Sequence, residues 1–205
     1  MVLYNNDMLI TRISPAVKTE GRYNVFVDEK YAFSLDETQL VKLGLKKGQE
    51  ISEEKLNEYK TESNFGKNYV RAVDLISRRL RSEREIRDYA WRKQWLPENT
   101  ERVIKRLYKY GYLDDNKFAK AFVISRSGRD FSTKRMKVEL IKKGIKPDII
   151  EQVLLENTEF DEITVLQKLI NKKRSHYDDE RKLIAYLVGK GFRYGDIIKE
   201  LKKEE

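Results

Sequence analysis

The sequence predicts a mainly α-helical protein in which a small β-rich N-terminal domain precedes three tandem three-helix repeats in an elongated, curved array. Strand-forming residues cluster only within residues 8–60, in runs such as MLITRISPAV and RYNVFV. From about Phe65 onward the apolar pattern is helical, and a closely similar stretch occurs three times. The predicted domains are residues 1–64, 65–113, 114–160 and 161–205.

The N-terminal domain is predicted to contain a β-hairpin followed by two helix starts. In VFVDEKYAFSL two short apolar runs flank residues 28–30, which is a hairpin pattern. Either Ser34 or Asp36 is expected to cap the next short helix, which ends at Gly44. LKKGQEIS predicts a turn and another short strand, and a helix is expected to begin at Ser52. The stretch TESNFGKN is expected to link this domain to the rest.

The repeated stretch is predicted to form two helices joined by a turn. Its three copies are EREIRDYAWRKQWLPENTERVI, KRMKVELIKKGIKPDIIEQVL and DERKLIAYLVGKGFRYGDIIKEL, and they align at offsets of 50 and 47 residues. Another helical segment precedes each copy: NYVRAVDLISRRL, NKFAKAFVISRSG and EITVLQKLINKKR. Each unit therefore has three helices. Because one such unit has a small core, we expect neighbouring units to share apolar faces.

The turns within these copies have a common chemistry. Gly144 and Gly191 close the second helix of their repeats, and a lysine precedes each of them where the helix dipole favours a cation. Gln94 occupies the equivalent place in the first repeat, so that turn is expected to have another geometry. Asp114-Asp115 and Asp178-Asp179 stand where helices begin, and we interpret them as N-caps.

Several aromatic side chains lie in the first repeat. Trp91 and Trp95 are four residues apart on one helical stripe, and both align with apolar positions of the second repeat. Core packing is therefore preferred over stacking on nucleic-acid bases. Tyr110 and Tyr112 flank Gly111 and are expected to close the third helix.

The positive charge is concentrated in the repeats. The formal net charge is +9. Residues 1–64 hold nine Lys and Arg against eleven Asp and Glu, whereas residues 65–205 hold 34 against 23. A basic region beside a nearly neutral one favours a polyanionic partner. A solvated lysine-rich surface with no such partner is the alternative.

Basic residues recur near the end of each first helix and the start of each second helix. Because these positions are equivalent in the repeat, the clusters are predicted to line one side of the array and bind an extended polyanion or the side of a filament. Alternatively, they are solvated faces paired with Glu83, Glu85 and Asp130. The candidate residues are Arg78, Arg79, Arg81, Arg84, Arg87, Arg126, Arg129, Lys134, Arg135, Lys137, Lys172, Lys173, Arg174, Arg181 and Lys182.

The sequence has no pattern that predicts catalysis. It contains no cysteine, which is compatible with a reducing cytoplasm, the location we expect. His176 is the only histidine and lies in a polar stretch without a second metal ligand. No phosphate-binding loop, secretory signal or apolar run of about 18 residues occurs. We therefore expect a non-enzymatic monomer that has no cofactor or metal and does not bind a membrane.

Several stretches of the sequence resemble one known protein family. RLYKYGYLDDNKFAKAFVISR, residues 106–126, resembles the most distinctive region of the RecX family of bacterial regulatory proteins. SEREIRDYAWRK and KVELIKKGI resemble the repeat motifs of that family, in which glycine is favoured where this chain has Gln94. Residues 21–51 resemble the extra domain of its longer members.

The resemblance implies three tandem three-helix repeats and a role as a modulator of the RecA recombinase in DNA repair. The implied partners are RecA and the filament of RecA on single-stranded DNA, with DNA itself as a further partner. It implies no catalytic residues and no known binding residues, so the basic clusters are inferred from the sequence alone. Two other classes remain open: a DNA- or RNA-binding module without a recombinase partner, and a helical adaptor for acidic proteins.

Overall fold

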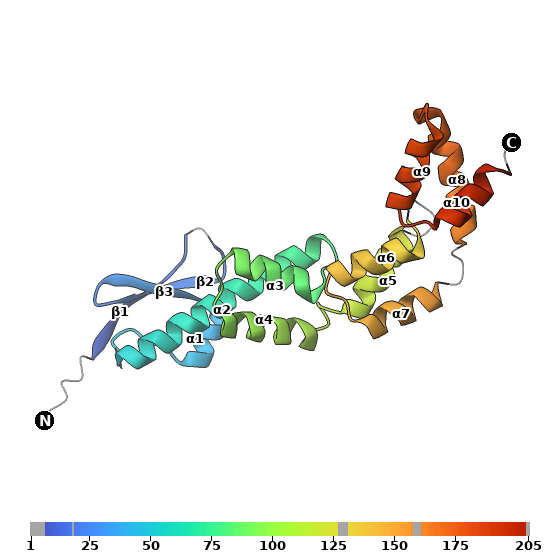
Figure 1. Ribbon diagram of the computed structural model, residues 1–205. Helices are drawn as coiled ribbons and strands as arrows, with labels where there is room; N and C mark the ends of the chain where they lie inside the picture. The colour runs from blue at the N-terminus through green and yellow to red at the C-terminus, as the bar shows by residue number, and fades with distance from the viewer. Residues whose placement is uncertain (1–6, 18, 127–130, 158–160, 204–205) are drawn as a thin grey trace, which may run out of the picture. The chain divides into compact units, whose positions relative to one another are not determined.

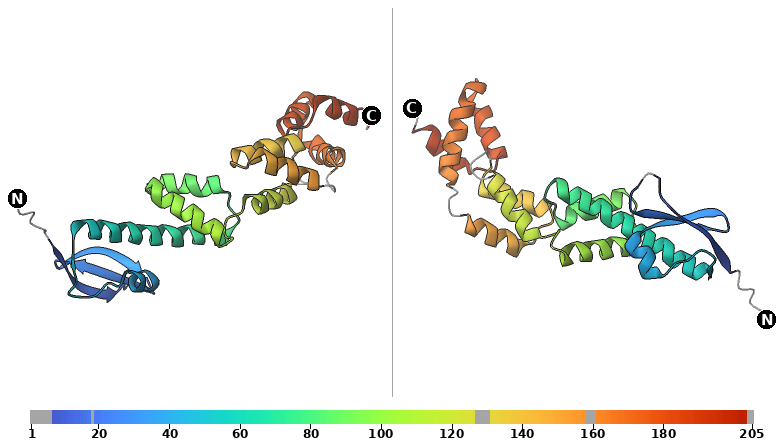
Figure 2. Two further views of the ribbon diagram at one scale, coloured as in Figure 1. Left: turned by 90° about the horizontal axis from the view of Figure 1, so that it is seen from below. Right: turned by 180° about the vertical axis from the view of Figure 1, so that it is seen from behind.

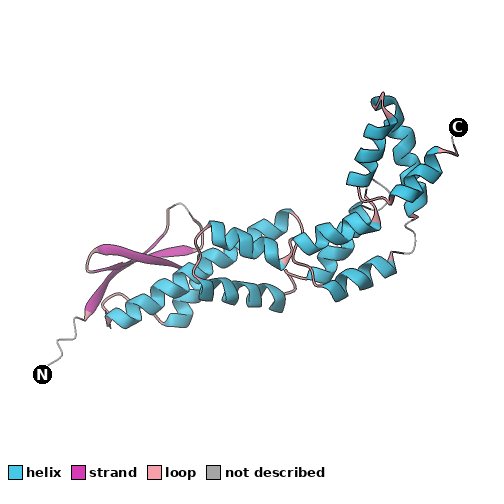
Figure 3. Ribbon diagram, viewed as in Figure 1, coloured by secondary structure: helices cyan, strands magenta, loops and turns pink. Residues whose placement is uncertain are grey.

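The computed structural model describes residues 7–17, 19–126, 131–157 and 161–203 (Figure 1). In these residues the chain is mainly α-helical, and the strands are confined to the N-terminal part (Figure 3), which confirms the predicted mainly α-helical fold with a β-rich N-terminal domain. The chain divides into two compact units. The first unit contains residues up to 79 and residues 89–112, and the second contains residues 80–88 and the chain from residue 113 onward.

The first unit begins with an antiparallel sheet of strand order β3-β2-β1-β4. The predicted hairpin joins β2 to β3. Its turn residues Asp28 and Glu29 have φ values of 47° and 62°, as expected for a tight turn between two twisted strands. The strands are β1 (Met8–Pro15), β2 (Arg22–Val27), β3 (Lys30–Asp36) and β4 (Glu50–Ile51).

The short helix α1 (Glu37–Leu43) follows the hairpin. Of the two candidate caps, Asp36 has this role: its Oδ1 accepts a hydrogen bond from the Gln39 N–H at 2.8 Å. Gly44 ends the helix with φ 61°, as predicted. Apolar side chains of the sheet, including Ile10, form the core of this domain with Leu56 and Tyr59 of the next helix.

That next helix, α2 (Glu53–Arg78), is continuous in both views of Figure 2. Ser52 caps it as predicted, and the stretch TESNFGKN, which was expected to link the small domain to the rest, forms part of this helix. The helix continues through Gly66 because this stretch packs on α1. A Cβ on Gly66 would lie 2.6 Å from Gln39 Oε1, and Gln39 Nε2 donates to the Glu62 carbonyl at 2.7 Å. The predicted domain boundary at residue 64 lies within α2, and the domain limits stay a prediction.

Helix α3 (Glu83–Arg92) is divided between the units after Asp88, and α4 (Pro97–Lys109) packs on α2 in the first unit. Helix α4 ends at Tyr110, which is followed by Gly111 with φ 69°. The Tyr112 N–H donates to the Leu107 carbonyl at 2.9 Å. The tyrosines therefore close this helix, as predicted.

The turn at Gln94 corrects a prediction. Gln94 adopts φ 54°, in the same left-handed region as Gly144 at 79° and Gly191 at 95°. The backbone hydrogen bond that closes the turn is also the same: Trp95 N–H donates to the Ala90 carbonyl at 3.0 Å, and Ile145 and Phe192 make the equivalent bonds. The turn therefore requires a left-handed backbone conformation at this position, even though glutamine disfavours it.

We expect Gln94→Gly to stabilise the first unit by about 1 kcal/mol, because a left-handed conformation costs a non-glycine residue about 1–2 kcal/mol and glycine loses part of that gain in chain entropy. Urea unfolding of the full chain, followed by tryptophan fluorescence, measures the change. Gln94→Ala, which keeps the strain, is the control and should give no stabilisation. An equal gain in both variants would show that the side chain, not the backbone, is responsible.

The prediction for Trp91 is also wrong. Trp95 is buried, but Trp91 is 80% exposed. The buried stripe of α3 contains Ile86 and Ala90, and Trp91 lies one residue beyond it, about 100° around the helix. Ile141, its equivalent in the second repeat, is 50% exposed. Apolar character at this repeat position therefore does not indicate burial.

The second unit contains two three-helix bundles, each with its own buried apolar cluster. Phe118, Met136 and Ile150 are among the core residues of the first bundle, and Leu166 and Leu187 are among those of the second. The first bundle is formed by α5 (Asp115–Arg126), α6 (Thr133–Lys142) and α7 (Pro147–Glu156). The second is formed by α8 (Glu162–Lys173), the 3-10 turn η1 (Arg174–His176), α9 (Glu180–Gly189) and α10 (Tyr194–Leu201).

Candidate interaction surface

The bundles of the second unit are joined at the N-terminus of α6. The Glu162 carboxylate, from the start of α8, accepts hydrogen bonds from the N–H and the hydroxyl of Thr133 at 3.0 and 2.6 Å. The buried Ser132 caps α6 and donates its N–H to the Lys190 carbonyl at 3.3 Å. An acid and a glycine turn from the third repeat thus complete the start of a second-repeat helix.

The same arrangement occurs one repeat earlier, at the N-terminus of α3. Asp115, from the start of α5, accepts a hydrogen bond from the Glu83 N–H at 2.9 Å. The buried Ser82 donates its hydroxyl to the Lys143 carbonyl at 2.8 Å. Of the predicted N-caps, Asp114 caps its own helix through the Lys117 N–H, whereas Asp115 caps its neighbour. We call these two contacts the repeat junctions.

The glycines of the turns lie directly on these junctions. A Cβ on Gly144 would lie 2.7 Å from Arg84 Cβ, and one on Gly191 would lie 2.4 Å from Ser132 Oγ and 2.9 Å from Arg135 Cβ. Arg84 and Arg135 therefore have a structural role as well as a charge. The equivalent start of α9 is capped by its own Asp179, whose Oδ1 accepts from the Arg181 N–H at 2.8 Å.

The junction at Asp115 predicts a pH-dependent stability. Burial raises the pKa of Asp115 above its usual value, although the hydrogen bond from Glu83 opposes the shift. A carboxyl with a raised native pKa costs stability once it ionises. Stability relative to Asp115→Asn should therefore fall as pH rises from the unfolded pKa of about 3.9 through the raised native pKa. Urea unfolding of both proteins across this range measures the difference.

A second variant separates charge from hydrogen bonding at this junction. Asp115→Asn keeps an acceptor for the Glu83 N–H, whereas Asp115→Ala leaves that donor without its partner. At neutral pH we expect the free energy of unfolding of Asp115→Ala to be about 1 kcal/mol lower than that of Asp115→Asn, which is the usual cost of removing a helix cap. Equal stability of the two variants would show that the hydrogen bond does not hold the junction.

Several candidate basic residues are held in ion pairs. Arg78 contacts Asp74 at 2.9 Å and Arg87 contacts Glu83 at 2.7 Å, as the alternative interpretation expected for Glu83. Glu85 also has a partner outside the candidate set, because Lys143 contacts it at 2.5 Å. Of the rest, Arg135 contacts Glu139 at 2.8 Å and Lys137 contacts Glu151 at 3.5 Å. Ion pairs within the chain therefore involve some of the candidate basic residues, but they do not explain why all of these residues are basic.

Other cations of the set lie over aromatic rings. The guanidinium of Arg126 lies 5.2 Å from the ring centre of Phe131, and that of Arg135 lies 5.8 Å from it. Lys190, which the sequence interpretation did not include, lies 5.5 Å from the same ring. The three cations thus surround one half-buried phenylalanine near the start of α6. Arg129 and Asp130 lie outside the described residues.

The remaining candidates lie at helix ends and in connections. Lys134, Lys172 and Lys182 are exposed, and their side chains make no hydrogen bond or ion pair with any described residue. Lys173 lies 6.0 Å from the ring centre of Tyr186. The others are exposed or half-buried on the surface of their own units: Arg79, Arg81, Arg174 and Arg181.

The position of these cations along the helices is informative. Arg84, Lys134 and Lys182 lie in the first turn of the second helix of their repeats. The helix dipole makes a positive charge at that end unfavourable, typically by about 0.3–1 kcal/mol. Helix stability therefore does not explain the cations. Caps from Asp115, Glu162 and Asp179 occupy N–H groups at these helix starts, so the cations themselves are the groups left to contact an external anion.

The structure also shows a basic aromatic surface in the first unit that the sequence interpretation missed. Arg102 lies 4.2 Å from the ring centre of Phe65, and Arg106 lies 4.6 Å from that of Tyr69 and 5.7 Å from that of Tyr110. Partial burial raises the pKa of Tyr69. The four-residue spacing of the arginines along α4 was the available signal. No described helix has the length and apolar composition needed to cross a membrane.

A small antiparallel sheet followed by three-helix modules, with cations at the starts of the second helices, defines a modular helical protein without a described catalytic constellation. The comparisons with known proteins agree with this class. Three family models match: "Regulatory protein RecX N-terminal domain" over residues 8–52, "RecX, first three-helix domain" over 69–107 and "RecX, second three-helix domain" over 114–154. The chain belongs to the RecX family of regulatory proteins.

Similar proteins cover nearly the whole chain. A regulatory protein RecX of Bacillus velezensis is 35% identical over 207 residues, which include 96% of this chain and 77% of that protein. One of Caldanaerobacter subterraneus subsp. tengcongensis is 32% identical over 197 residues, 95% of this chain and 98% of that protein. A crystal structure described as regulatory protein RecX matches with a TM-score of 0.70 and 27% identity over 97% of this chain and 100% of that one. The names of these relatives indicate a regulatory role.

Proposed function

We propose that the chain is a non-enzymatic regulator that binds RecA and its filament on single-stranded DNA in the cytoplasm and lowers the recombinase and ATPase activity of RecA. Family membership supports a regulatory role. The observation that carries the proposal further is the placement of Arg84, Lys134 and Lys182 in first helical turns, where they oppose the helix dipole. We therefore infer that these three side chains contact a partner.

The mechanism is differential binding. A regulator that binds one state of the filament more tightly than another shifts filament assembly and nucleotide turnover by its difference in affinity for the two states. The basic side chains of the repeats contact acidic RecA surface or DNA phosphates. Trp91, with its exposed indole, belongs to a residue type that is enriched in the energetically important part of protein interfaces.

A RecA ATPase assay on single-stranded DNA tests this proposal. We expect a fall in ATP hydrolysis when the protein is added in substoichiometric amounts, because a protein that changes filament assembly affects many RecA subunits at once. Unchanged hydrolysis at a ratio of one molecule per RecA monomer would contradict the proposal. Stimulation would support the partner but reverse the direction of the effect.

The exposed cations at helix starts also favour a second candidate, a DNA-binding module without a recombinase partner, because lysine and arginine side chains contact DNA phosphates. Gel shifts with single-stranded and duplex DNA distinguish the two functions. The module should bind DNA tightly without RecA, whereas the proposed regulator requires RecA for its tightest binding. In either case, affinity for DNA should fall with a log–log salt slope of about −0.7 to −0.9 for each phosphate contact.

A further inference from the structure

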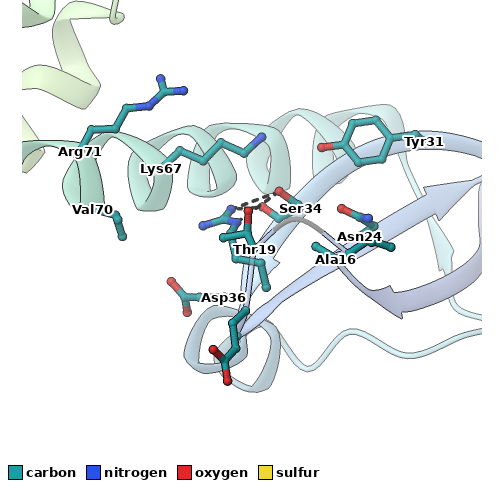
Figure 4. A pocket seen from close by; sticks show the side chains of 13 residues that line it. Ala16, Thr19, Asn24, Tyr31, Ser34, Asp36, Lys67, Val70 and Arg71 are labelled. Carbon is teal, nitrogen blue, oxygen red and sulfur yellow. Dashed lines mark hydrogen bonds between the residues drawn. The ribbon is translucent and has the colours of Figure 1, made fainter. Parts of the chain in front are cut away.

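The N-terminal part of the first unit contains a cavity that the proposed function does not use. Its volume is about 650 Å³, within the range of about 300–1,000 Å³ typical of ligand sites. Figure 4 shows Lys67, Val70 and Arg71 extending from α2, and Thr19 and Tyr31 lying among the residues of the sheet and its loop that line the cavity. The cavity therefore lies between one helix and the sheet.

Three cations line this cavity. Arg22 is fixed in place, because it donates hydrogen bonds to the Ser34 carbonyl at 2.6 Å and to the Ser34 hydroxyl at 3.2 Å. Ser63 also donates to the Ser34 carbonyl, at 2.6 Å. Burial lowers the pKa of Arg22, an effect that Asp36 partly opposes. The side chains of Lys67 and Arg71 make no hydrogen bond or ion pair in the described part of the chain.

The carboxylates beside these cations do not neutralise Lys67 and Arg71. Asp36 Oδ1 is engaged in capping α1 through the Gln39 N–H. Glu20 lies on the exposed loop between β1 and β2. Apolar surface completes the lining, since Tyr31 and Val70 are 54% and 59% exposed. A ligand with both anionic and apolar groups matches this combination.

We propose that the cavity binds a short acidic segment of a partner protein, with two carboxylates on Lys67 and Arg71 and an apolar side chain against Tyr31 and Val70. Residues four apart on a helix have side chains about 5–6 Å apart. Alternate residues of an extended peptide lie on one face about 7 Å apart. A segment with acids at alternate positions therefore places one carboxylate near each of the two cations.

The same features disfavour a nucleic acid at this site. A phosphate backbone is uniformly negative, and its binding is driven by an excess of positive charge over the whole contact surface. Glu20 and Asp36 line the cavity, and residues 1–64 hold more acidic than basic residues. Separate carboxylates on a peptide can contact the cations and avoid these acids.

Fluorescence anisotropy with the full chain and a labelled ten-residue peptide tests the proposal. The peptide has Glu at two alternate positions, flanked by Leu and Phe, and its control has Gln in place of Glu. We expect the acidic peptide to bind at least tenfold more tightly than the control. Binding to Lys67→Glu/Arg71→Glu should be at least tenfold weaker than to the unmodified chain, and Lys67→Gln/Arg71→Gln should show an intermediate loss.

Matched controls make the result decisive. Lys46→Glu/Lys47→Glu changes the charge equally in the same domain but outside the cavity, and should bind the peptide normally. Helical circular dichroism confirms that each variant is folded. No binding by the unmodified chain up to 1 mM peptide, equal losses in both double variants, or displacement of the peptide by a ten-nucleotide dT strand would overturn the proposal. Because RecA is not used, the outcome is independent of the proposed regulatory function.

Discussion

Gly191→Ala is expected to destabilise the second unit by about 2–5 kcal/mol, the combined cost of a left-handed conformation and of overpacking. Gly191 has φ 95°, which strains any L-residue. The added Cβ would also lie 2.4 Å from Ser132 Oγ and 3.1 Å from the Arg135 backbone nitrogen. Ser132 is fully buried and caps α6, so it has no free space into which to move.

Gly189→Ala is the matched control for this prediction. Gly189 lies two residues earlier, at the end of α9, and a Cβ there would meet no atom within 4 Å. We expect this variant to be more stable by about 0.5–1 kcal/mol, because glycine within a helix is unfavourable. Urea unfolding followed by far-ultraviolet circular dichroism measures both variants. Similar midpoints for the two would show that the α6 junction does not constrain the turn.

Features that depend on local chemistry were predictable from the sequence. The cap of α1, narrowed by the sequence to Ser34 or Asp36, the stop at Gly44 and the closing tyrosines near Gly111 each depend on residues within a few positions along the chain. The strands and the repeat spacing follow from patterns of apolar residues. The stretch TESNFGKN was expected only to link the domains, and its helical conformation is supported by contacts with α1 that lie far away in sequence.

Features that depend on contacts between repeats were not predictable in this way. Asp115 has the pattern of an N-cap, and it is one, but for α3, whose first residue Glu83 lies 32 positions away. Arg84 and Arg135 looked like surface charges, yet both lie against glycine turns of the next repeat. A repeat alignment equates positions between units but does not say which of them face a neighbour. The exposed Trp91 was misassigned for the same reason.

Replacing three exposed lysines should separate binding from stability. We expect Lys134→Glu/Lys172→Glu/Lys182→Glu to reduce both RecA inhibition and DNA affinity at least tenfold, since it lowers the formal net charge by six from +9. Their side chains contact no described polar group, so the free energy of unfolding should change by less than about 1 kcal/mol. ATPase inhibition, gel shifts and thermal unfolding of one preparation measure the three effects.

The effects of the helix dipole make this test specific. Lys134 and Lys182 lie in first turns, where glutamate is favourable, and Lys172 lies in a last turn, where it is unfavourable, so their contributions to stability partly offset each other. Lys30→Glu/Lys46→Glu/Lys47→Glu changes the net charge equally within the N-terminal domain. If binding depends only on overall charge, both triple variants will be impaired alike. If it depends on cations at the helix ends of the repeats, only the first will lose binding, and the log–log salt slope of its DNA affinity will be shallower by about 0.7–0.9 for each phosphate contact removed.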